Sequence, residues 1–246
     1  MSGRRPTSGA ATRDTRDPSE HASPLGHLEP IDPSALDLES FRGRRVAVLG
    51  LARSGIALAR FLVDRGAEVV VYDHRPLAAL ADAVEALEGR RVTLRLGPDV
   101  DPGDVIGQVA LVTTSPSVSS RYPTTEPRLR AALAAVEAEG RVPVLGEIDL
   151  FLRLCPAPTI GVSGTKGKTT TSSLSAAVLG RGAAPVILGG NIGTPLVERL
   201  PELEAGHRVV VELSELQLPT LGHGTTVAVY THVTQDHLDR HGSVGA

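Results

Sequence analysis

Residues 158–171 read Pro-Thr-Ile-Gly-Val-Ser-Gly-Thr-Lys-Gly-Lys-Thr-Thr-Thr. The apolar start of this stretch predicts a short buried strand, and its end opens a helix over 169–179 with Leu174, Val178 and Leu179 on one side. Between the two lies a turn rich in glycine. A turn at this place, leading into a helix N-terminus, points backbone N–H groups at an anion such as phosphate. The stretch therefore predicts an α/β domain with a nucleotide triphosphate site.

The only two lysines of the chain, Lys166 and Lys168, lie in this turn. Lys and Arg total 25, so the other 23 of these residues are arginines. Lysine is a compact point charge that can reach among phosphate oxygens, whereas arginine is a planar fork. We therefore assign Lys168 to the β- and γ-phosphates and the Thr169 hydroxyl to Mg²⁺. The general G-x-x-x-x-G-K-[ST] pattern fails by one residue, because Val162 stands at its first glycine. A glycine turn capped by threonines is the alternative interpretation.

The composition is that of a globular protein, with 41% hydrophobic and 22% charged residues in a chain of 246. A net charge of -3 gives no argument for binding nucleic acid or an anionic membrane. No apolar run approaches the about 20 residues of a membrane span, and the N-terminus lacks the apolar core of a secretory signal. Cys155 is the single cysteine, so no intrachain disulfide can form and a reducing, cytoplasmic location is expected.

The order of local patterns predicts two α/β domains after a disordered extension. Residues 1–42 are rich in proline, serine and charges without periodicity, which predicts disorder. Residues 43–146 alternate strand and helix patterns, which predicts a Rossmann-like, doubly wound domain. Residues 147–246 begin with a linking helix at 147–154 and continue into the phosphate turn, which predicts an incomplete ATPase domain of P-loop type. The expected strands lie at 45–49, 68–73, 109–114, 142–145, 186–188, 209–213 and 226–230, and the expected helices of the first domain run from 56 to a terminating Gly66 and over 127–139.

The turn at 50–55, between the first strand and the first helix, resembles a dinucleotide-binding fingerprint whose middle glycine is Ala52. Asp73 follows Gly50 by 23 residues and ends the next strand, where an acid can bind ribose. The pattern predicts a nucleotide-like ligand at the strand ends. It also fits a strand–helix turn that merely requires small residues.

Two further places carry candidate ligands of a metal ion. Glu212 ends an apolar strand next to the phosphate turn, which suits a Mg²⁺ ligand but also suits an acid that faces solvent. His237 and His241 are four residues apart, a spacing that zinc sites use on helices. The segment has neither the Glu of H-E-x-x-H nor a cysteine, so we favour Asp236 and His237 facing the phosphate turn. A polar helix start capped by Thr234 is the other alternative.

Four blocks of sequence occur in a fixed order, namely Gly164-Thr165-Lys166-Gly167-Lys168-Thr169-Thr170, Gly189-Gly190-Asn191-Ile192-Gly193, Glu212-Leu213-Ser214 with Gln217-Leu218, and Asp236-His237-Leu238-Asp239-Arg240-His241. In this order they resemble the Mur ligase family, whose ATP loop is shorter than the general phosphate-loop pattern. The segments 114–116 and 146–151 are similar to the branch of the family that adds D-glutamate. The resemblance extends over residues 44–243.

The resemblance implies an ATP-dependent, ADP-forming amide ligase of peptidoglycan precursor synthesis. In that reaction ATP phosphorylates the carboxylate of UDP-N-acetylmuramoyl-L-alanine, and the amine of D-glutamate attacks the acyl phosphate to give the amide. The implied cofactors are ATP and Mg²⁺. We expect a cytoplasmic monomer without nucleic-acid or membrane partners.

The resemblance also implies roles for individual residues. The ATP loop would be formed by Gly164, Thr165, Lys166, Gly167, Lys168, Thr169 and Thr170. The catalytic group would be Lys168, Asn191, Glu212 and His237, with Mg²⁺ held by Thr169, Glu212 and His237. The UDP part of the substrate would be bound by Arg53, Ser54, Asp73, His74 and Arg75.

The chain departs from the family pattern at Lys166 in place of Asn, Ser117 in place of Gly, Glu215-Leu216 in place of Ser-Phe, and His232 in place of Asn. No lysine follows Lys168 in these residues, so we expect them to lack the counterpart of the family's carbamylated lysine and the domain that binds the amino acid. We therefore expect these 246 residues not to catalyse ligation alone. Two other classes stay open. One is an NAD-dependent oxidoreductase built on residues 50–73, and the other is a non-catalytic module that binds a UDP-sugar.

Overall fold

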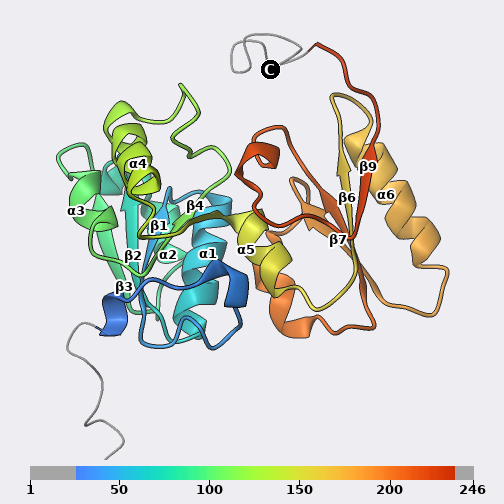
Figure 1. Cartoon of the computed structure of the whole chain (residues 1–246), viewed down its shortest axis with the longest axis horizontal. Helices are drawn as coiled ribbons and strands as arrows, with labels where there is room; N and C mark the ends of the chain where they lie inside the picture. Colours follow the sequence, from blue (N-terminus) through green and yellow to red (C-terminus); the bar gives the residue numbers. More distant parts are fainter. Residues whose placement is uncertain (1–25, 236–246) are drawn as a thin grey trace, which may run out of the picture.

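The computed structural model describes residues 26–235 of the chain. They form two α/β lobes, each built on a parallel sheet, and helix α5 (Glu147–Leu154) connects the two sheets (Figure 1). This confirms the mixed α/β class expected from the sequence. The linking helix has the bounds that the sequence predicted.

The first lobe is a five-stranded sheet in the order β3-β2-β1-β4-β5. Its strands are β1 (Arg45–Leu49), β2 (Glu68–Asp73), β3 (Val92–Leu96), β4 (Leu111–Thr114) and β5 (Val144–Gly146), and every pairing is parallel. Its helices are α1 (Arg53–Asp64), α2 (Ala81–Glu85), α3 (Pro102–Ile106) and α4 (Pro127–Glu139), and the short 3₁₀ helix η3 (Leu77–Ala79) precedes α2. Successive side chains of β1 point to opposite faces, and both faces are buried: Val48 lies in the cluster with α1, and Leu49 in the cluster with α3 and α4.

Helix α1 ends as the sequence predicted. Gly66 has a φ of +80°, which a residue with a side chain rarely adopts, and its N–H donates to the carbonyl of Val63 at 2.9 Å. The N–H of Ala67 donates to Leu62 at 3.0 Å, which satisfies a second carbonyl of the last turn. The chain then enters β2, which pairs with β1 from Arg45↔Glu68 to Leu49↔Tyr72.

The second lobe is a four-stranded parallel sheet in the order β7-β8-β6-β9. Its strands are β6 (Thr159–Ser163), β7 (Val186–Gly190), β8 (Arg208–Glu212) and β9 (Val227–Tyr230). Helix α6 (Lys168–Leu179) contacts β6, β7 and β8, and the 3₁₀ helices are η4 (Leu196–Glu202) and η5 (Leu218–Thr220). All four strands begin within a few residues of the predicted positions, because their apolar runs are bounded by turn residues.

The buried side of α6 differs from the expected one. Leu174 and Val178 are 63% and 62% exposed, and the helix faces the sheet with small residues around the buried Ser172. Small side chains allow the helix to approach the sheet closely. Two of the three apolar positions that the sequence placed on the buried side of α6 are therefore exposed, and only Leu179 is half-buried.

The expectation of a disordered extension as far as residue 42 is wrong for the part from residue 26 onward. Here the chain forms η1 (Gly26–Leu28) and η2 (Pro33–Ala35) and packs on the first lobe. Phe41 is fully buried with its ring 5.9 Å from that of Phe61, and the N–H of Ile31 donates to Ala110 at 3.0 Å. Apolar burial and hydrogen bonding offset the cost of ordering this proline-rich segment. Residues 1–25 lie outside the described residues.

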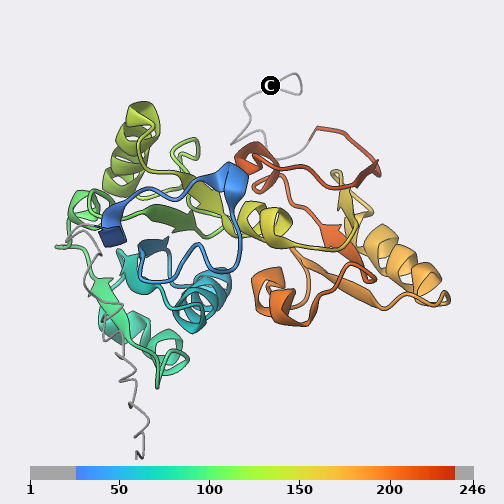
Figure 2. The ribbon, with the colours of Figure 1, turned by 60° about the horizontal axis from the view of Figure 1, so that its bottom comes forward.

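The two lobes share one apolar core. Side chains of α1, α5 and η4 lie in the same buried cluster, which includes Leu58, Phe151 and Val197. Figure 2 shows α5 between the lobes, with the blue N-terminal segment alongside it. Arg153 connects α5 to the N-terminal segment, because its guanidinium donates to the Pro33 carbonyl at 2.8 Å and to Asp149, also on α5, at 3.0 Å.

Candidate functional site

A pocket of about 410 Å³ lies at the carboxyl ends of β1, β2 and β4. The chain passes from β1 to β2 and β3 on one side of β1 and then returns to β4 and β5 on the other side. Open parallel sheets bind ligands at the strand ends where the order reverses in this way. The pocket is lined by residues from the three strand ends and from the loop between β4 and α4. Polar members of the lining include Asp73, His74, Arg75, Ser115, Ser117, Thr124, Thr125 and Glu126.

Asp73 joins the turns that follow β1 and β2 through its hydrogen bonds with Leu51 and Arg75. Its carboxylate is buried, and Oδ2 accepts from the Leu51 N–H at 2.8 Å and from Arg75 Nη2 at 2.8 Å. Oδ1 accepts from the backbone N–H and the Nε of Arg75, at 2.9 and 3.0 Å. Burial alone would raise the pKa of Asp73, but the hydrogen bonds from Arg75 and Leu51 outweigh it and hold the pKa below the ordinary value. Asp73 is therefore ionised and fixes Arg75 at the pocket.

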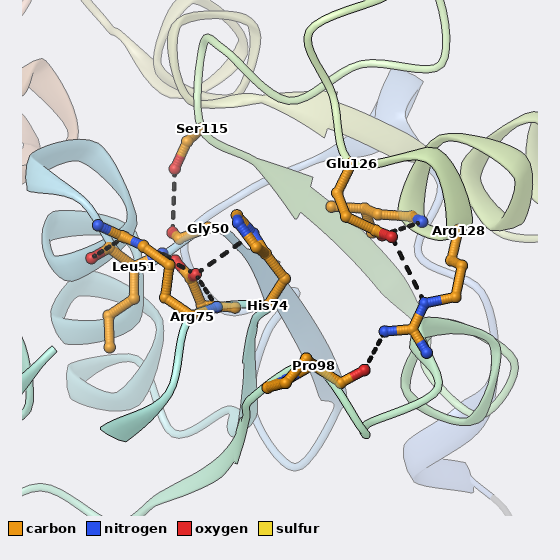
Figure 3. Close-up of polar contacts among 10 residues, drawn as sticks. Gly50, Leu51, His74, Arg75, Pro98, Ser115, Glu126 and Arg128 are labelled. Carbon is orange, nitrogen blue, oxygen red and sulfur yellow. Dashed lines mark hydrogen bonds and ion pairs between the residues drawn. The ribbon is translucent and has the colours of Figure 1, made fainter. Parts of the chain in front are cut away.

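The rest of the pocket rim carries charge of both signs. His74 is half exposed, with Nδ1 3.7 Å from Asp73. Glu126 caps the start of α4 by accepting from the Leu129 N–H at 2.7 Å, and Arg128 lies beside it (Figure 3). Burial would raise the pKa of Glu126, but the Leu129 N–H and Arg128 lower it overall.

The turn after β1 is tightly packed. Gly50 has a φ of +91°, and a Cβ on Gly55 would lie only 1.8 Å from the Gly50 carbonyl oxygen. Both glycines are therefore required by the backbone. Ala52 is the exposed N-cap residue of α1 and makes no side-chain capping bond. Arg53 and Ser54 form the first turn of α1 beside the pocket and are not among its lining residues.

The phosphate turn predicted from sequence lies between β6 and α6. Gly167 is the N-cap of α6 with a φ of +88°, and it offers no side chain to the helix N–H groups. Lys168 folds back over the turn, where its Nζ donates to the carbonyls of Gly164 at 2.7 Å and Thr165 at 3.2 Å. Thr169 and Thr170 are exposed at the helix start. A helix N-terminus with free N–H groups beside an ammonium favours an anion.

A second loop is hydrogen-bonded to the phosphate turn. It follows β9, the strand next to β6, and its Thr231 hydroxyl donates to the Lys166 carbonyl at 2.6 Å. The Thr165 N–H donates to the His232 carbonyl at 2.6 Å, and the Thr165 hydroxyl donates to the Thr234 carbonyl at 3.0 Å. The sequence analysis did not identify Thr231 and considered Thr234 only as a helix cap. The position of these residues after a strand adjacent to β6 was the signal that could have identified them.

Glu212 ends β8, beside the start of the phosphate turn, since it pairs in register with Val162 of β6. Its side chain is buried, and Oε1 accepts from Asn191 Nδ2 at 3.0 Å. Oε2 is buried without a hydrogen-bond partner. The loop that carries Asn191 lies close because Gly190, with a φ of +102°, has no Cβ, which would otherwise be 2.4 Å from the Glu212 carbonyl oxygen.

An unpartnered buried carboxylate oxygen is unfavourable unless a cation or another donor reaches it. Magnesium sites at phosphates use one or two carboxylates together with phosphate oxygens and water. The donor set at Glu212 therefore fits Mg²⁺ bound with a nucleotide. Within residues 26–235 no three His, Cys, Asp or Glu side chains gather as a metal cluster. His237, Asp236 and His241 lie outside the described residues.

Two matches to known families cover most of the chain. Residues 44–138 match the family described as "Mur ligase MurD-like, N-terminal domain", and residues 162–246 match "Mur ligase middle domain". The chain belongs to the Mur ligase family. The first matched segment contains β1 to β4 of the first lobe, and the second begins in β6 and contains β7 to β9 of the second lobe of this Mur ligase chain.

Curated relatives of this Mur ligase chain are named UDP-N-acetylmuramoylalanine--D-glutamate ligase. That of Anaeromyxobacter dehalogenans is 42% identical over 207 residues, which is 83% of this chain and 42% of the relative. Those of Sphingopyxis alaskensis and Pelobacter propionicus are 41% and 39% identical, over 82% and 81% of this chain and 44% and 43% of the relatives. The chain therefore spans less than half the length of these relatives.

Among solved structures, a short-chain type dehydrogenase/reductase from Mycobacterium marinum aligns over 71% of this chain and 96% of its own, with 15% identity and a TM-score of 0.35. Similarity at that level carries no argument about fold or function. In the described part of this Mur ligase chain, no helix has the length and apolar character needed to cross a membrane.

Proposed function

We propose that the chain carries the ATP-binding and UDP-substrate-binding parts of a ligase that joins D-glutamate to UDP-N-acetylmuramoyl-L-alanine, a step of peptidoglycan precursor synthesis. The observation that carries the proposal is the buried Glu212 carboxylate with an unpartnered oxygen, on the strand beside the turn that holds Lys168. The substrates are those in the names of the relatives. The overall reaction consumes ATP and gives an amide, ADP and phosphate.

The second lobe would bind ATP as a P-loop-type domain. Gly164 and Gly167 have positive φ at the turn, and Gly164 has no Cβ, which lets Thr231 approach the turn from the loop after β9. Lys168 would exchange its two carbonyl contacts for the β- and γ-phosphates. Glu212 would hold Mg²⁺ with the Thr169 hydroxyl and His237. When bound, Mg²⁺ would neutralise charge on the phosphate oxygens. Thr165, Lys166 and Thr170 would complete the nucleotide site.

Asn191 would position the Glu212 carboxylate. Its amide donates to Oε1 and would hold the carboxylate while Oε2, which has no partner, stays available to the cation. The reaction then depends on holding the phosphate acceptor and the nucleotide in fixed positions, which is the main source of rate in phosphoryl transfer.

The first lobe would bind the UDP part as a Rossmann-like domain, a description supported by its strand order. Arg75, held by Asp73, offers a planar cation at the pocket, with His74 beside it. The first turn of α1, with Arg53 and Ser54, would face the diphosphate. Ala52 places a methyl group where a dinucleotide fingerprint has its second glycine, which argues against NAD.

The family match favours the ligase over an oxidoreductase. A non-catalytic UDP-sugar-binding module would keep the first pocket without needing the orphaned oxygen of Glu212, so the second lobe also favours the ligase. The proposal includes a reducing cytoplasmic location, supported by the single Cys155, and a monomer that gel filtration would test.

Titration with a fluorescent ATP analogue in the presence of Mg²⁺ tests the nucleotide site. Lys168→Ala should weaken binding about 10- to 100-fold, because charge-assisted hydrogen bonds contribute about 1.5–3 kcal/mol. The matched control is Lys166→Ala, at an exposed position two residues away, which should be much milder. Equal losses in the two variants would contradict the role given to Lys168. Calorimetry with UDP-N-acetylmuramoyl-L-alanine and with NADH tests the first pocket, and tight NADH binding would overturn the proposal.

A further inference from the structure

The loop between β4 and α4 belongs to the pocket of the first lobe and also contacts the second lobe. Its two ends line the pocket, with Ser115, Ser117 and Val118 on one side and Thr124 to Glu126 on the other. Its middle reaches the other lobe. The Tyr122 hydroxyl donates to the Leu216 carbonyl at 2.5 Å, and Arg121 Nη1 donates to the Pro219 carbonyl at 3.2 Å. The green loop and the orange-red turn that it contacts lie side by side in Figures 1 and 2.

This loop is held as a unit by its own hydrogen bonds. The N–H of Tyr122 donates to Ser119 at 3.4 Å, and the N–H of Thr125 donates to Tyr122 at 3.0 Å. The Thr125 hydroxyl accepts from the Ser119 N–H at 3.1 Å. Tyr122 is itself buried. A shift of the pocket-lining ends would therefore move Tyr122 with them.

Tyr122 contacts the turn at residues 214–218, which is also held by its own hydrogen bonds. This turn follows Glu212, the proposed cation ligand, after one residue. Ser214 and Gln217 close it, since Gln217 Oε1 accepts from the Ser214 N–H at 2.8 Å and from its hydroxyl at 3.1 Å. Leu213, between this turn and Glu212, accepts from the Ser163 hydroxyl at 3.1 Å. The Leu213 carbonyl therefore connects this turn to Ser163 at the end of β6, where the phosphate turn begins.

We propose that Tyr122 is a positioning residue that couples the two sites: a UDP-linked ligand in the first pocket fixes the β4–α4 loop, and the Tyr122–Leu216 hydrogen bond then fixes the turn behind Glu212 for the magnesium nucleotide. The proposal rests on the proposed function, since it uses the ligands named there. Coupling between sites is reciprocal, so each ligand raises the affinity for the other by the same factor. Coupling of this kind is typically about 5- to 150-fold.

The test is a set of four dissociation constants. A fluorescent ATP analogue with Mg²⁺ is titrated with and without saturating UDP-N-acetylmuramoyl-L-alanine, and the UDP ligand is titrated with and without the nucleotide. The wild-type chain should show at least about 5-fold coupling in both directions. Tyr122→Phe keeps the buried ring and removes only the hydroxyl, so each ligand alone should bind as before while the coupling factor falls toward one. The matched control is Tyr230→Phe, at a side chain that is 64% exposed, which should keep the coupling.

Hydrogen exchange gives a second readout that a merely structural role would not change. The UDP ligand alone should slow exchange of the amides at 214–218 in the wild type and in Tyr230→Phe, and should leave them unchanged in Tyr122→Phe. Independent binding of the two ligands in the wild type, or full coupling in Tyr122→Phe, would overturn the proposal while leaving the proposed function intact. Failure of the UDP ligand to bind the wild type would overturn both.

Discussion

Replacing Glu147 by glutamine should make the protein more stable above neutral pH. Glu147 is the first residue of α5 and is almost fully buried, and Oε1 accepts from the Val197 N–H at 3.3 Å. Burial raises the pKa of Glu147 from 4.5 to about 7, although the N–H groups of Val197 and Leu196 and the charge of Arg53 act in the opposite direction. The folded protein therefore holds this proton more tightly than the unfolded chain does.

The sign and the size of the effect follow from this difference. A raised carboxyl pKa carries no cost below pH 4.5, where both states are protonated, and carries its full cost above about pH 7, where the folded state must bury a charge. At about 1.4 kcal/mol for each pKa unit, the free energy of unfolding should fall by about 3 kcal/mol across this range. The amide introduced by Glu147→Gln keeps an acceptor for the Val197 N–H and has no proton to lose, so this fall should disappear in the variant.

The assay is urea unfolding of the wild type and the variant at several pH values from 5 to 8. The quantity of interest is how the stability difference between the two proteins changes with pH, because any fixed cost of burying the amide is the same at every pH. Groups with lowered pKa values, such as Asp73 and Glu126, titrate equally in both proteins and cancel. Exposed Glu204→Gln is the control and should show a constant difference. A constant difference for Glu147→Gln as well would refute the reasoning.

Two further substitutions test the first lobe. Gly55→Ala should destabilise the protein by more than the about 1–3 kcal/mol of ordinary overpacking, because its Cβ would meet the Gly50 carbonyl oxygen at 1.8 Å; Gly206→Ala, with open space around it, should be near neutral in the same thermal unfolding experiment. Asp73→Asn should weaken UDP-N-acetylmuramoyl-L-alanine binding about 10-fold or more in calorimetry, because the guanidinium of Arg75 loses the charged partner that fixes it. Unchanged affinity would show that Arg75 does not depend on Asp73.

The sequence predicted the elements whose signals are local. The bounds of β2, α4 and α5 were confirmed, because β2 is a continuous apolar run and α4 has proline in its first turn and Gly140 with a φ of +65° after its end. Strand β3 was missed, since it is the edge strand with a half-buried, alternating pattern. Phe41 was assigned to a disordered extension because its burial depends on Phe61 and not on any local period.

The candidate site also has residues whose place in the fold could be predicted from the sequence and contacts that could not. Lys168 and Glu212 could be placed from sequence, since the ends of parallel strands meet at one edge of a sheet and both residues follow or end such a strand. The long-range hydrogen bonds around these residues could not be predicted from the sequence. Thr231 reaches Lys166 across 65 positions, and Tyr122 reaches Leu216 across 94, each through one hydroxyl and one backbone carbonyl. A carbonyl acceptor is present at every residue, so the sequence carries no signal for which one a distant hydroxyl will bind. Topology thus determines which strand ends meet, whereas the hydrogen bonds between distant loops, within one lobe or between the two, depend on tertiary packing.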